Sequence, residues 1–398
     1  MEKINVVHYM NEFRNILSYA TNIGFFFGAG TSCAFGLPNI ISLTEDTAKK
    51  LDVDDKVTFD KVRETISNLS GITDKTSISV ESILNYIRQV REITQGRKDY
   101  NVGNVSGEQA KKLDTAICNA IFNIISTKEK TADISPIRQF MAWYDSANRD
   151  FIKEIYTTNY DMLLEMAMEA NYIPYFDGFV GGYEPFFSPE SIEGFPNEGD
   201  LTNKWVRLWK IHGSLNWMKK EATSTSAERI VRSGKIDVPY NELMIYPSKE
   251  KYNLSRKEPY IAYFDRFKSY LQHGELVLIC SGYSFSDQHI NDLIFNALRQ
   301  NKRLYVMVFC YADEQVETMN PYANSHMNLC IMGPKKMILN GIEREWLFDT
   351  TDDEDLCSGL YWNKTKQTFE LGDFRRLIGF LIENSGRKSM VEEIANAK

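Results

Sequence analysis

A glycine-rich turn, Gly28-Ala-Gly-Thr-Ser, follows a short apolar run near the start of the chain. Glycine lacks a Cβ atom, so Gly28 and Gly30 let the backbone turn tightly and come close to a ligand. The two hydroxyl residues after Gly30 lie where the free N–H groups of a helix start would face a phosphate. The turn therefore predicts phosphate binding. An ordinary strand-to-helix turn is the alternative, because Cys33 replaces the last glycine of the dinucleotide fingerprint.

Three later apolar runs also end in polar residues. They lead into Thr158-Asn159-Tyr160-Asp161, into His212-Gly213-Ser214 and into Gly282-Tyr283-Ser284. The runs have the length and apolar character of strands that are buried in a parallel sheet. In such a sheet, ligands bind in the crevice outside the carboxyl ends of the strands. We therefore expect the four strand ends, including the one before Gly28, to meet at one pocket.

Asn159, His212 and Asp161 are the candidate catalytic residues at these strand ends. An amide both donates and accepts hydrogen bonds, so Asn159 suits the fixing of a bound ribose or a water. Histidine has a pKa of about 6.5, so His212 suits a general base near neutral pH. Asp161 suits the orienting of its loop or the retention of a leaving group. The structural alternatives are a turn former, a satisfied loop histidine and a helix cap. We expect Asn159 and His212 to be reachable from solvent.

In their order along the chain, these motifs resemble those of the sirtuins. The matching segments are Gly28-Ala29-Gly30-Thr31-Ser32, Gly36-Leu37-Pro38, Thr158-Asn159-Tyr160-Asp161, His212-Gly213 and Gly282-Tyr283-Ser284. The resemblance covers roughly residues 20–300 and is greatest to the sirtuin-like NADases of bacterial anti-phage defence. Those proteins show a Lys-Ile-His-Gly-Ser loop, here residues 210–214, and a Gly-Tyr-Ser turn followed by an aspartate, here residues 282–287.

The resemblance implies a Rossmann-like parallel sheet flanked by helices and an NAD hydrolase that releases ADP-ribose and nicotinamide. NAD would be bound as the substrate, and its depletion would cause abortive infection. In the family, catalysis depends on the residues that match Asn159 and His212. The NAD-binding residues that the resemblance implies are Gly28, Ala29, Gly30, Thr31, Ser32, Leu37, Pro38, Thr158, Asn159, Gly282, Tyr283, Ser284 and Asp287.

Two departures separate the chain from the protein deacylases among the sirtuins. Deacylases follow the proline with Asp-Phe-Arg, whereas Asn-Ile-Ile stands here at residues 39–41. Deacylases also carry two Cys-x-x-Cys pairs for a structural zinc, which needs closely spaced ligands. The cysteines here are Cys33, Cys118, Cys280, Cys310, Cys330 and Cys357. Since no two lie close together, we expect no zinc site. An NAD-dependent deacylase or ADP-ribosyltransferase and a non-catalytic NAD or ADP-ribose sensor stay open as alternatives.

The composition is that of a globular protein of the cytoplasm. The chain has 398 residues and a formal net charge of −8, which gives no strong sign of direct nucleic-acid binding. No apolar run reaches the roughly 18 residues that a membrane-spanning helix needs. The first residues lack the pattern of a secretory leader, and the scattered cysteines fit a reducing compartment. We therefore expect a cytoplasmic location and no membrane association.

The apolar periodicities divide the chain into three regions. Residues 1–38 and 151–310 are expected to form the sirtuin-like Rossmann domain, residues 39–150 a helical insertion, and residues 311–398 a carboxyl-terminal extension. By resemblance, such a chain is the NADase subunit of a two-component defence system. Its expected partner is a HerA-type hexameric ATPase, with a short Argonaute-type protein as the alternative. We also expect a homo-oligomer, because subunit contacts can hold a regulated site shut or open.

Overall fold

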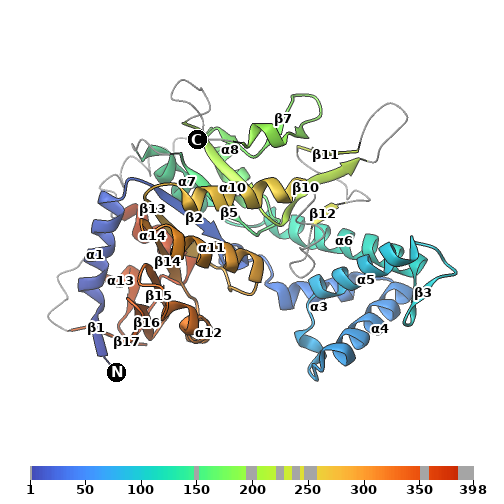
Figure 1. The fold of residues 1–398 in the computed structure, drawn as a ribbon, viewed down its shortest axis with the longest axis horizontal. Helices are drawn as coiled ribbons and strands as arrows, with labels where there is room; N and C mark the ends of the chain where they lie inside the picture. Colours follow the sequence, from blue (N-terminus) through green and yellow to red (C-terminus); the bar gives the residue numbers. More distant parts are fainter. Residues whose placement is uncertain are drawn as a thin grey trace.

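A large sheet with helices on both faces forms the centre of the molecule (Figure 1). The computed structural model describes residues 2–147, 152–193, 204–220, 228–234, 243–245, 258–349 and 358–383. Most neighbouring strands of the sheet run parallel. The expected class, an α/β protein with a Rossmann-like parallel sheet flanked by helices, is confirmed.

The sheet contains ten strands. In spatial order they are β1 (Glu2–Asn5), β17 (Ile342–Leu347), β16 (Lys336–Leu339), β15 (Leu329–Met332), β14 (Leu304–Phe309), β13 (Leu276–Ser281), β2 (Ile23–Phe27), β5 (Glu154–Thr157), β9 (Val206–Lys210) and β6 (Tyr175–Phe176). Only the pairs of β16 with β15 and β17 are antiparallel.

The four strands that were expected to end at one pocket are neighbours in this sheet. They are β13, β2, β5 and β9, and each of the three pairs is parallel. Of these four strands, β2 comes first in the chain. The chain continues to β5 and β9 on one side of β2, and it later adds β13 and β14 on the other side, so the strand order reverses at β2. Such a switch in strand order is where open α/β sheets bind their ligands. The four strand ends therefore lie next to one another at one edge of the sheet.

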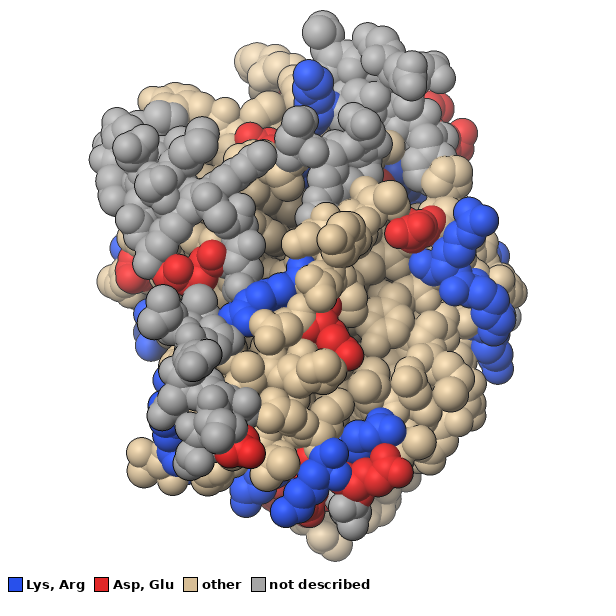
Figure 2. All heavy atoms as spheres, turned by 90° about the vertical axis from the view of Figure 1, so that its left-hand side faces the viewer, with Lys and Arg blue, Asp and Glu red and all other residues tan. Residues whose placement is uncertain are grey.

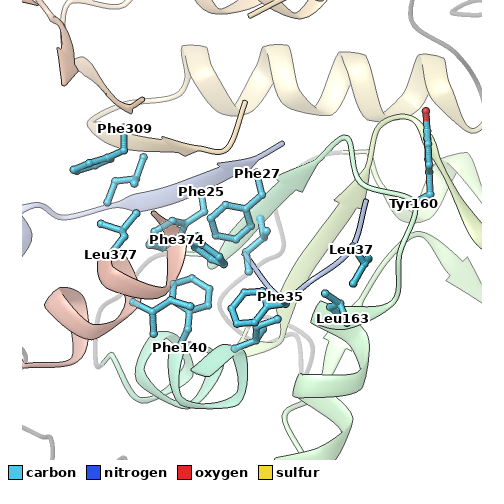
Figure 3. Packing of buried hydrophobic residues seen from close by; sticks show 14 of the residues in the cluster. Phe25, Phe27, Phe35, Leu37, Phe140, Tyr160, Leu163, Phe309, Phe374 and Leu377 are labelled. Atoms are coloured by element: carbon cyan, nitrogen blue, oxygen red, sulfur yellow. The ribbon is translucent and has the colours of Figure 1, made fainter. Parts of the chain in front are cut away.

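Alternate side chains of β2 fill the cores on the two faces of the sheet, because successive residues of a strand point to opposite sides. Phe25 and Phe27 point to one face, where Phe25 meets Phe140 with ring centroids 5.0 Å apart and Phe27 meets Phe374 at 4.8 Å (Figure 3). Phe26 points to the other face. All three rings are buried, which explains the continuous apolar run in the sequence.

Helices cover both faces of the sheet. The core that contains Phe25 also contains side chains of α1 (Val6–Tyr19), α7 (Ser135–Ser146), α8 (Leu163–Ala170), α13 (Ser358–Tyr361) and α14 (Phe374–Glu383). The core around Phe26 contains side chains of α10 (Tyr260–Gln272), α11 (Gln288–Gln300) and α12 (Asp313–Ala323). Both layers therefore bury one apolar stripe per helix against the sheet.

A group of four helices lies beside the sheet (Figure 1). It consists of α3 (Ile40–Lys50), α4 (Val53–Ser70), α5 (Val80–Thr94) and α6 (Gly107–Glu129), with the short hairpin β3 (Asn101–Val102) and β4 (Val105–Ser106). Residues 39–150, expected as one helical insertion, thus also supply α7, which packs on the sheet. The residues after 310, expected as an extension, add three strands to the same sheet.

A second, antiparallel sheet continues from β9. Its strands, in spatial order, are β12 (Leu243–Ile245), β10 (Gly213–Lys220), β11 (Arg229–Arg232), β8 (Phe186–Phe187) and β7 (Phe179–Val180). Strand β10 begins directly after His212, so this sheet starts at the predicted pocket. Among the described helices, none is both long and apolar enough to cross a membrane.

Candidate functional site

The loops that follow β2 and β13 are packed against each other. The Gly28 amide donates to the Ser281 carbonyl at 3.0 Å, and the Gly30 amide donates to the Gly282 carbonyl at 2.9 Å. A Cβ atom on Gly30 would lie 2.7 Å from the Cα atom of Gly282, and one on Gly28 would lie 2.5 Å from the Gly282 carbonyl oxygen. The glycines are therefore needed for contact between two loops, and not only for the approach of a ligand.

Gly282 is the partner in this contact. Its φ angle is +65°, which glycine adopts without strain, and a Cβ there would overlap the Thr31 amide nitrogen. The amides of Gly28, Gly30 and Thr31 donate to carbonyl groups of the protein, so fewer amides are available to a phosphate than the sequence suggests. The turn continues as the short helix α2 (Ala29–Cys33), in which Ala29 and Gly30 are exposed.

Asn159 joins the turn after β5 to the turn after β2. Its Nδ2 atom donates to the hydroxyl of Thr31 at 3.0 Å and to that of Ser32 at 2.8 Å. The Ser32 hydroxyl donates in turn to Oδ2 of Asp161 at 2.6 Å. The Oδ1 atom of Asn159 is buried and has no hydrogen-bond partner among the described residues. This amide is held by its nitrogen and has an acceptor left for a ligand or a water.

Asp161 orients the loop that carries Asn159. Besides the contact with Ser32, its Oδ1 accepts from the Leu163 amide at 3.2 Å, at the start of α8. The Thr158 amide donates to the Phe27 carbonyl at 3.1 Å and ties the same loop to β2. These contacts serve the loop-orienting and helix-capping roles that were considered for Asp161, because both carboxylate oxygens are engaged by the protein.

His212 is paired with Asp287. Nε2 of the imidazole lies 3.1 Å from Oδ2 of the carboxylate, and the other carboxylate oxygen accepts from the His289 amide at 3.0 Å at the start of α11. The two side chains come from different strand ends, β9 and β13. The His212 side chain is 7% exposed, so it lies deeper than the solvent-reachable position expected from the sequence. The aspartate fixes the orientation of the ring.

A small cavity lies below Asn159, between the turns after β2 and β5 and the end of β9. The cavity is small and has room for about one water molecule. Its lining residues are Phe27, Thr31, Ser32, Ile137, Thr157, Asn159, Asp161, Leu163, Leu164, Glu165, Lys210 and Phe374. The wall therefore mixes polar side chains, including Glu165 of α8 and Lys210 of β9, with apolar side chains from β2, α7, α8 and α14.

The other expected NAD-binding residues fall into a buried and an exposed set. The Tyr283 ring packs on Phe26 with centroids 4.8 Å apart, and its hydroxyl donates to Oδ1 of Asn291 at 3.0 Å. Leu37 is buried in the core and Pro38 is half-buried. The side chains of Tyr283 and Leu37 thus support the loops from inside.

Ser284 lies at the surface of the same region. Its hydroxyl is 3.0 Å from that of Ser286, and both side chains are exposed. Of the expected set after β13, Ser284 is therefore placed to meet a ligand with its side chain, whereas Gly282 and Tyr283 shape the turn.

Lys210, Glu165 and Glu129 were not assigned a role from the sequence. The Lys210 ammonium lies 2.6 Å from the Asp161 carbonyl oxygen and 2.7 Å from Oε1 of Glu165. Oε1 of Glu129, the last residue of α6, accepts from the Met162 amide at 2.6 Å. A lysine at the end of the strand, directly before the Ile-His-Gly-Ser loop, was the one signal in the sequence for this cluster.

Burial raises the pKa values of the two glutamates in the cluster. Burial, reinforced by the negative charge of Asp161, raises the pKa of Glu129 from 4.5 to about 7. Burial also raises the pKa of Glu165, against the opposing effect of Lys210. The site thus rests on a buried set of carboxylates around one lysine.

The structure offers no candidate metal centre in the ranges that it describes. No group of three His, Cys, Asp or Glu side chains suited to a metal ion occurs there. Cys33, Cys118, Cys280, Cys310 and Cys330 are free cysteines, and Cys357 lies outside the described residues. Burial raises the pKa of Cys118 and of Cys330 to about 12, so these thiols stay protonated at neutral pH.

Charges of both signs are mixed on one face of the molecule (Figure 2). On the described part of that face, Lys and Arg side chains stand in small groups beside Asp and Glu, without a broad basic area. A surface that tracks a nucleic-acid backbone would carry such an area.

Residues 153–331, slightly less than half of the chain, match the sequence model of the SIR2-like domain. The match spans Asn159, His212 and Asp287 and begins after the glycine turn. No curated protein sequence matches the chain significantly.

Solved structures of Sir2 homologues are similar to the chain. One is the crystal structure of a Sir2 homologue in complex with NAD, with 14% identity over 75% of this chain and 81% of that chain and a TM-score of 0.38. Another is a mutant Sir2 homologue in complex with 2′-O-acetyl ADP-ribose, with 13% identity over 75% of this chain and 83% of that chain and a TM-score of 0.35.

Proposed function

We propose that the protein is an NAD hydrolase that cleaves NAD to ADP-ribose and nicotinamide. The observation that carries this proposal is the meeting of two groups at one edge of the sheet. These are the Asn159 amide, held by Thr31 and Ser32, and the His212–Asp287 pair. The match of residues 153–331 to the SIR2-like domain supports the proposal, because it covers both groups.

The arrangement suits the breaking of an N-glycosidic bond. Nicotinamide leaves from a positively charged state, so the transition state resembles an oxocarbenium ion and needs little help from a general acid. The remaining need is to hold the ribose and to activate a water or a ribose hydroxyl. Asp287 holds Nε2 of His212 at 3.1 Å and so fixes the imidazole, the group proposed as the base, at the strand end.

The residues present fit NAD at the turns after β2, β5 and β13. The buried Oδ1 of Asn159, without a partner among the described residues, is an acceptor suited to an N–H or O–H group of the substrate. The exposed start of α2, at Ala29 and Gly30, is a place where a diphosphate can approach the backbone. Ser284, two residues after Gly282, adds an exposed hydroxyl.

We further propose that the hydrolase acts in anti-phage defence by depleting NAD in the cytoplasm. This role rests on the resemblance of the ordered motifs to the bacterial defence NADases. By the same resemblance, the partner is a HerA-type ATPase, with a short Argonaute-type protein as the alternative, and the chain forms a homo-oligomer. The helical group α3–α6 and the region after residue 310 are the candidate contact surfaces.

The test is the release of nicotinamide from NAD by the purified protein, measured by chromatography. The assay contains no acylated peptide and is run with the chain alone and with a co-expressed HerA-type ATPase. We expect His212→Gln to lower kcat by about 10²–10⁴-fold, the usual contribution of a general base. Glutamine keeps a donor for Asp287, so the fold should persist. Asn159→Ala should likewise abolish most of the activity.

His8→Gln is the matched control, because His8 is an exposed histidine outside the site. It should retain full activity, and circular dichroism should show the same fold for all variants. Near-normal turnover of His212→Gln would disprove the role of the base. Absence of nicotinamide release under both conditions would refute hydrolysis, and strict dependence on an acetyl-lysine peptide would favour a deacylase.

A further inference from the structure

Lys210 is a buried cation beside the proposed catalytic residues. It ends β9, two residues before His212, and its side chain is 3% exposed. Its ammonium group makes three short contacts: the Asp161 carbonyl oxygen at 2.6 Å, Oε1 of Glu165 at 2.7 Å and the Ser214 hydroxyl at 2.8 Å. An ammonium group has three hydrogens, so these contacts use its full donor capacity. Such a fixed geometry is unusual for a flexible side chain.

The contact with Asp161 connects Lys210 to Asn159 in three steps. Lys210 holds the backbone of Asp161, whose carboxylate accepts from the Ser32 hydroxyl at 2.6 Å. That hydroxyl in turn accepts from Nδ2 of Asn159 at 2.8 Å. A shift of the Asp161 backbone would therefore move the Ser32 hydroxyl and the amide that it holds.

The contact with Ser214 connects Lys210 to the loop that carries His212. Lys210 and Ser214 flank His212 on both sides, and Ser214 is the second residue of β10, the strand that leads away from the site. The next residue, Leu215, donates its amide to the Tyr160 carbonyl at 3.1 Å. The loops after β5 and β9 are thus fastened together by Lys210 and by backbone hydrogen bonds, which include the one from Ile211 to Thr157 at 2.9 Å.

Glu165 compensates the buried charge of Lys210. Its side chain is 6% exposed and comes from α8. Removing one member of a buried ion pair leaves an unpaired charge and is strongly destabilising, whereas replacing both by apolar residues of similar volume is often tolerated. A double replacement therefore removes the contact to Asp161 without leaving a buried charge.

We propose that Lys210 is a positioning residue for the hydrolysis of NAD, with Glu165 as its counter-ion. It holds the loop after β5 against the loop after β9 and so fixes Asn159 relative to His212. The expected effect of Lys210 on turnover rests on the proposed function. The expected effect of Lys210 on the position of the loop after β5 does not. A misplacement of about 1 Å at a reacting centre costs about 10²-fold in rate, so the position of the loop matters for turnover.

The test compares the wild type with Lys210→Met/Glu165→Leu. Hydrogen exchange followed by mass spectrometry measures the opening of residues 158–163, and steady-state kinetics measure nicotinamide release. We expect exchange in this segment to become about tenfold faster or more. We expect kcat to fall by about 10–100-fold. KM should change much less than kcat, because the turn after β2 keeps its contacts with Gly282.

Lys336→Met/Glu343→Leu is the matched control. This pair is also mostly shielded from solvent, with Nζ and Oε1 at 3.6 Å, but it lies on β16 and β17, at the other end of the sheet from β5 and β9. The control should leave both exchange in residues 158–163 and kcat unchanged. If the first double variant does not fold, Lys210→Gln/Glu165→Gln replaces it, because it also leaves no unpaired buried charge. Glutamine is one bond shorter than lysine and cannot reach the Asp161 carbonyl, so the same increase in exchange is expected.

Unchanged exchange in residues 158–163 would overturn the proposal, whatever the activity. Faster exchange with an unchanged kcat would overturn it too, because the loop position would then have no effect on turnover. If the wild type does not cleave NAD at all, the proposed function fails, and the exchange data still decide whether Lys210 holds the loop. The two failures are therefore distinguishable.

Discussion

Glu129 makes the stability of the protein depend on pH in a way that a single substitution removes. Its carboxylate is 8% exposed and stands beside Asp161 at the end of α6. Burial raises its pKa from 4.5 in the unfolded chain to about 7 in the folded protein. The folded state therefore binds the proton more tightly. As the pH rises from about 4.5 to about 7, the free energy of unfolding falls, because the buried group must ionise.

The size of this effect follows from the two pKa values. A shift of one unit corresponds to about 1.4 kcal/mol, so the full penalty above the folded pKa is about 3 kcal/mol. Between pH 5 and pH 8, Glu129 should lower the free energy of unfolding by about 2.5 kcal/mol. Glu129→Gln has the same shape and keeps an oxygen for the Met162 amide, but it does not ionise.

The assay is urea unfolding followed by tryptophan fluorescence at pH 5 and at pH 8. At each pH, the free energy of unfolding of the wild type is subtracted from that of Glu129→Gln. This difference should be about 2.5 kcal/mol larger at pH 8 than at pH 5. The control is Glu108→Gln, which changes an exposed glutamate at the start of the same helix. It should shift stability by no more than about 0.5 kcal/mol. An equal stability difference for Glu129→Gln at both pH values would refute the reasoning.

Two further predictions concern the glycine turns and metal content. Gly282→Ala should lower the free energy of unfolding by more than about 1 kcal/mol, because φ is +65° and the new Cβ would overlap the Thr31 amide; an unchanged melting temperature would contradict the loop packing. Elemental analysis of the purified protein should find no stoichiometric zinc, and a chelator should leave the melting temperature unchanged, whereas about one zinc per chain would disprove the expectation drawn from the cysteine spacing.

The strand ends of the site were predictable because their signal is local. Each of the four strands is a short, largely apolar segment followed by a polar residue or a glycine. These are Gly28 after β2, Thr158 after β5, His212 after β9 and Gly282 after β13. Both the length and the end of such a segment can be read along the chain. Parallel strands place such ends at one edge, so the placement of Asn159 and His212 at the ends of the neighbouring strands β5 and β9 followed from the pattern. The alternation of Phe25, Phe26 and Phe27 between two cores follows from the same local geometry.

The long-range contacts were not predictable, because nothing in the local sequence records them. Gly30 needs its small size because of Gly282, which lies far away in the chain. Likewise, the pairing of His212 with Asp287 and of Lys210 with the Asp161 carbonyl depends on which strands become neighbours. The burial of His212 is a product of the same packing, which periodicity alone does not report.

The position of β2 in the sheet has a consequence for the synthesis of the protein. Strand β2 pairs with β5 on one side and with β13 on the other. During synthesis it has no neighbouring strand until the ribosome reaches β5 at residue 154, and β13 is complete only at residue 281. At about 5–20 residues per second, its three consecutive phenylalanines wait on the order of ten seconds for a partner on the ribosome. An unpaired apolar strand is prone to aggregate, so the nascent chain should depend on a chaperone that covers this segment, and slower growth at low temperature should improve the yield of folded protein.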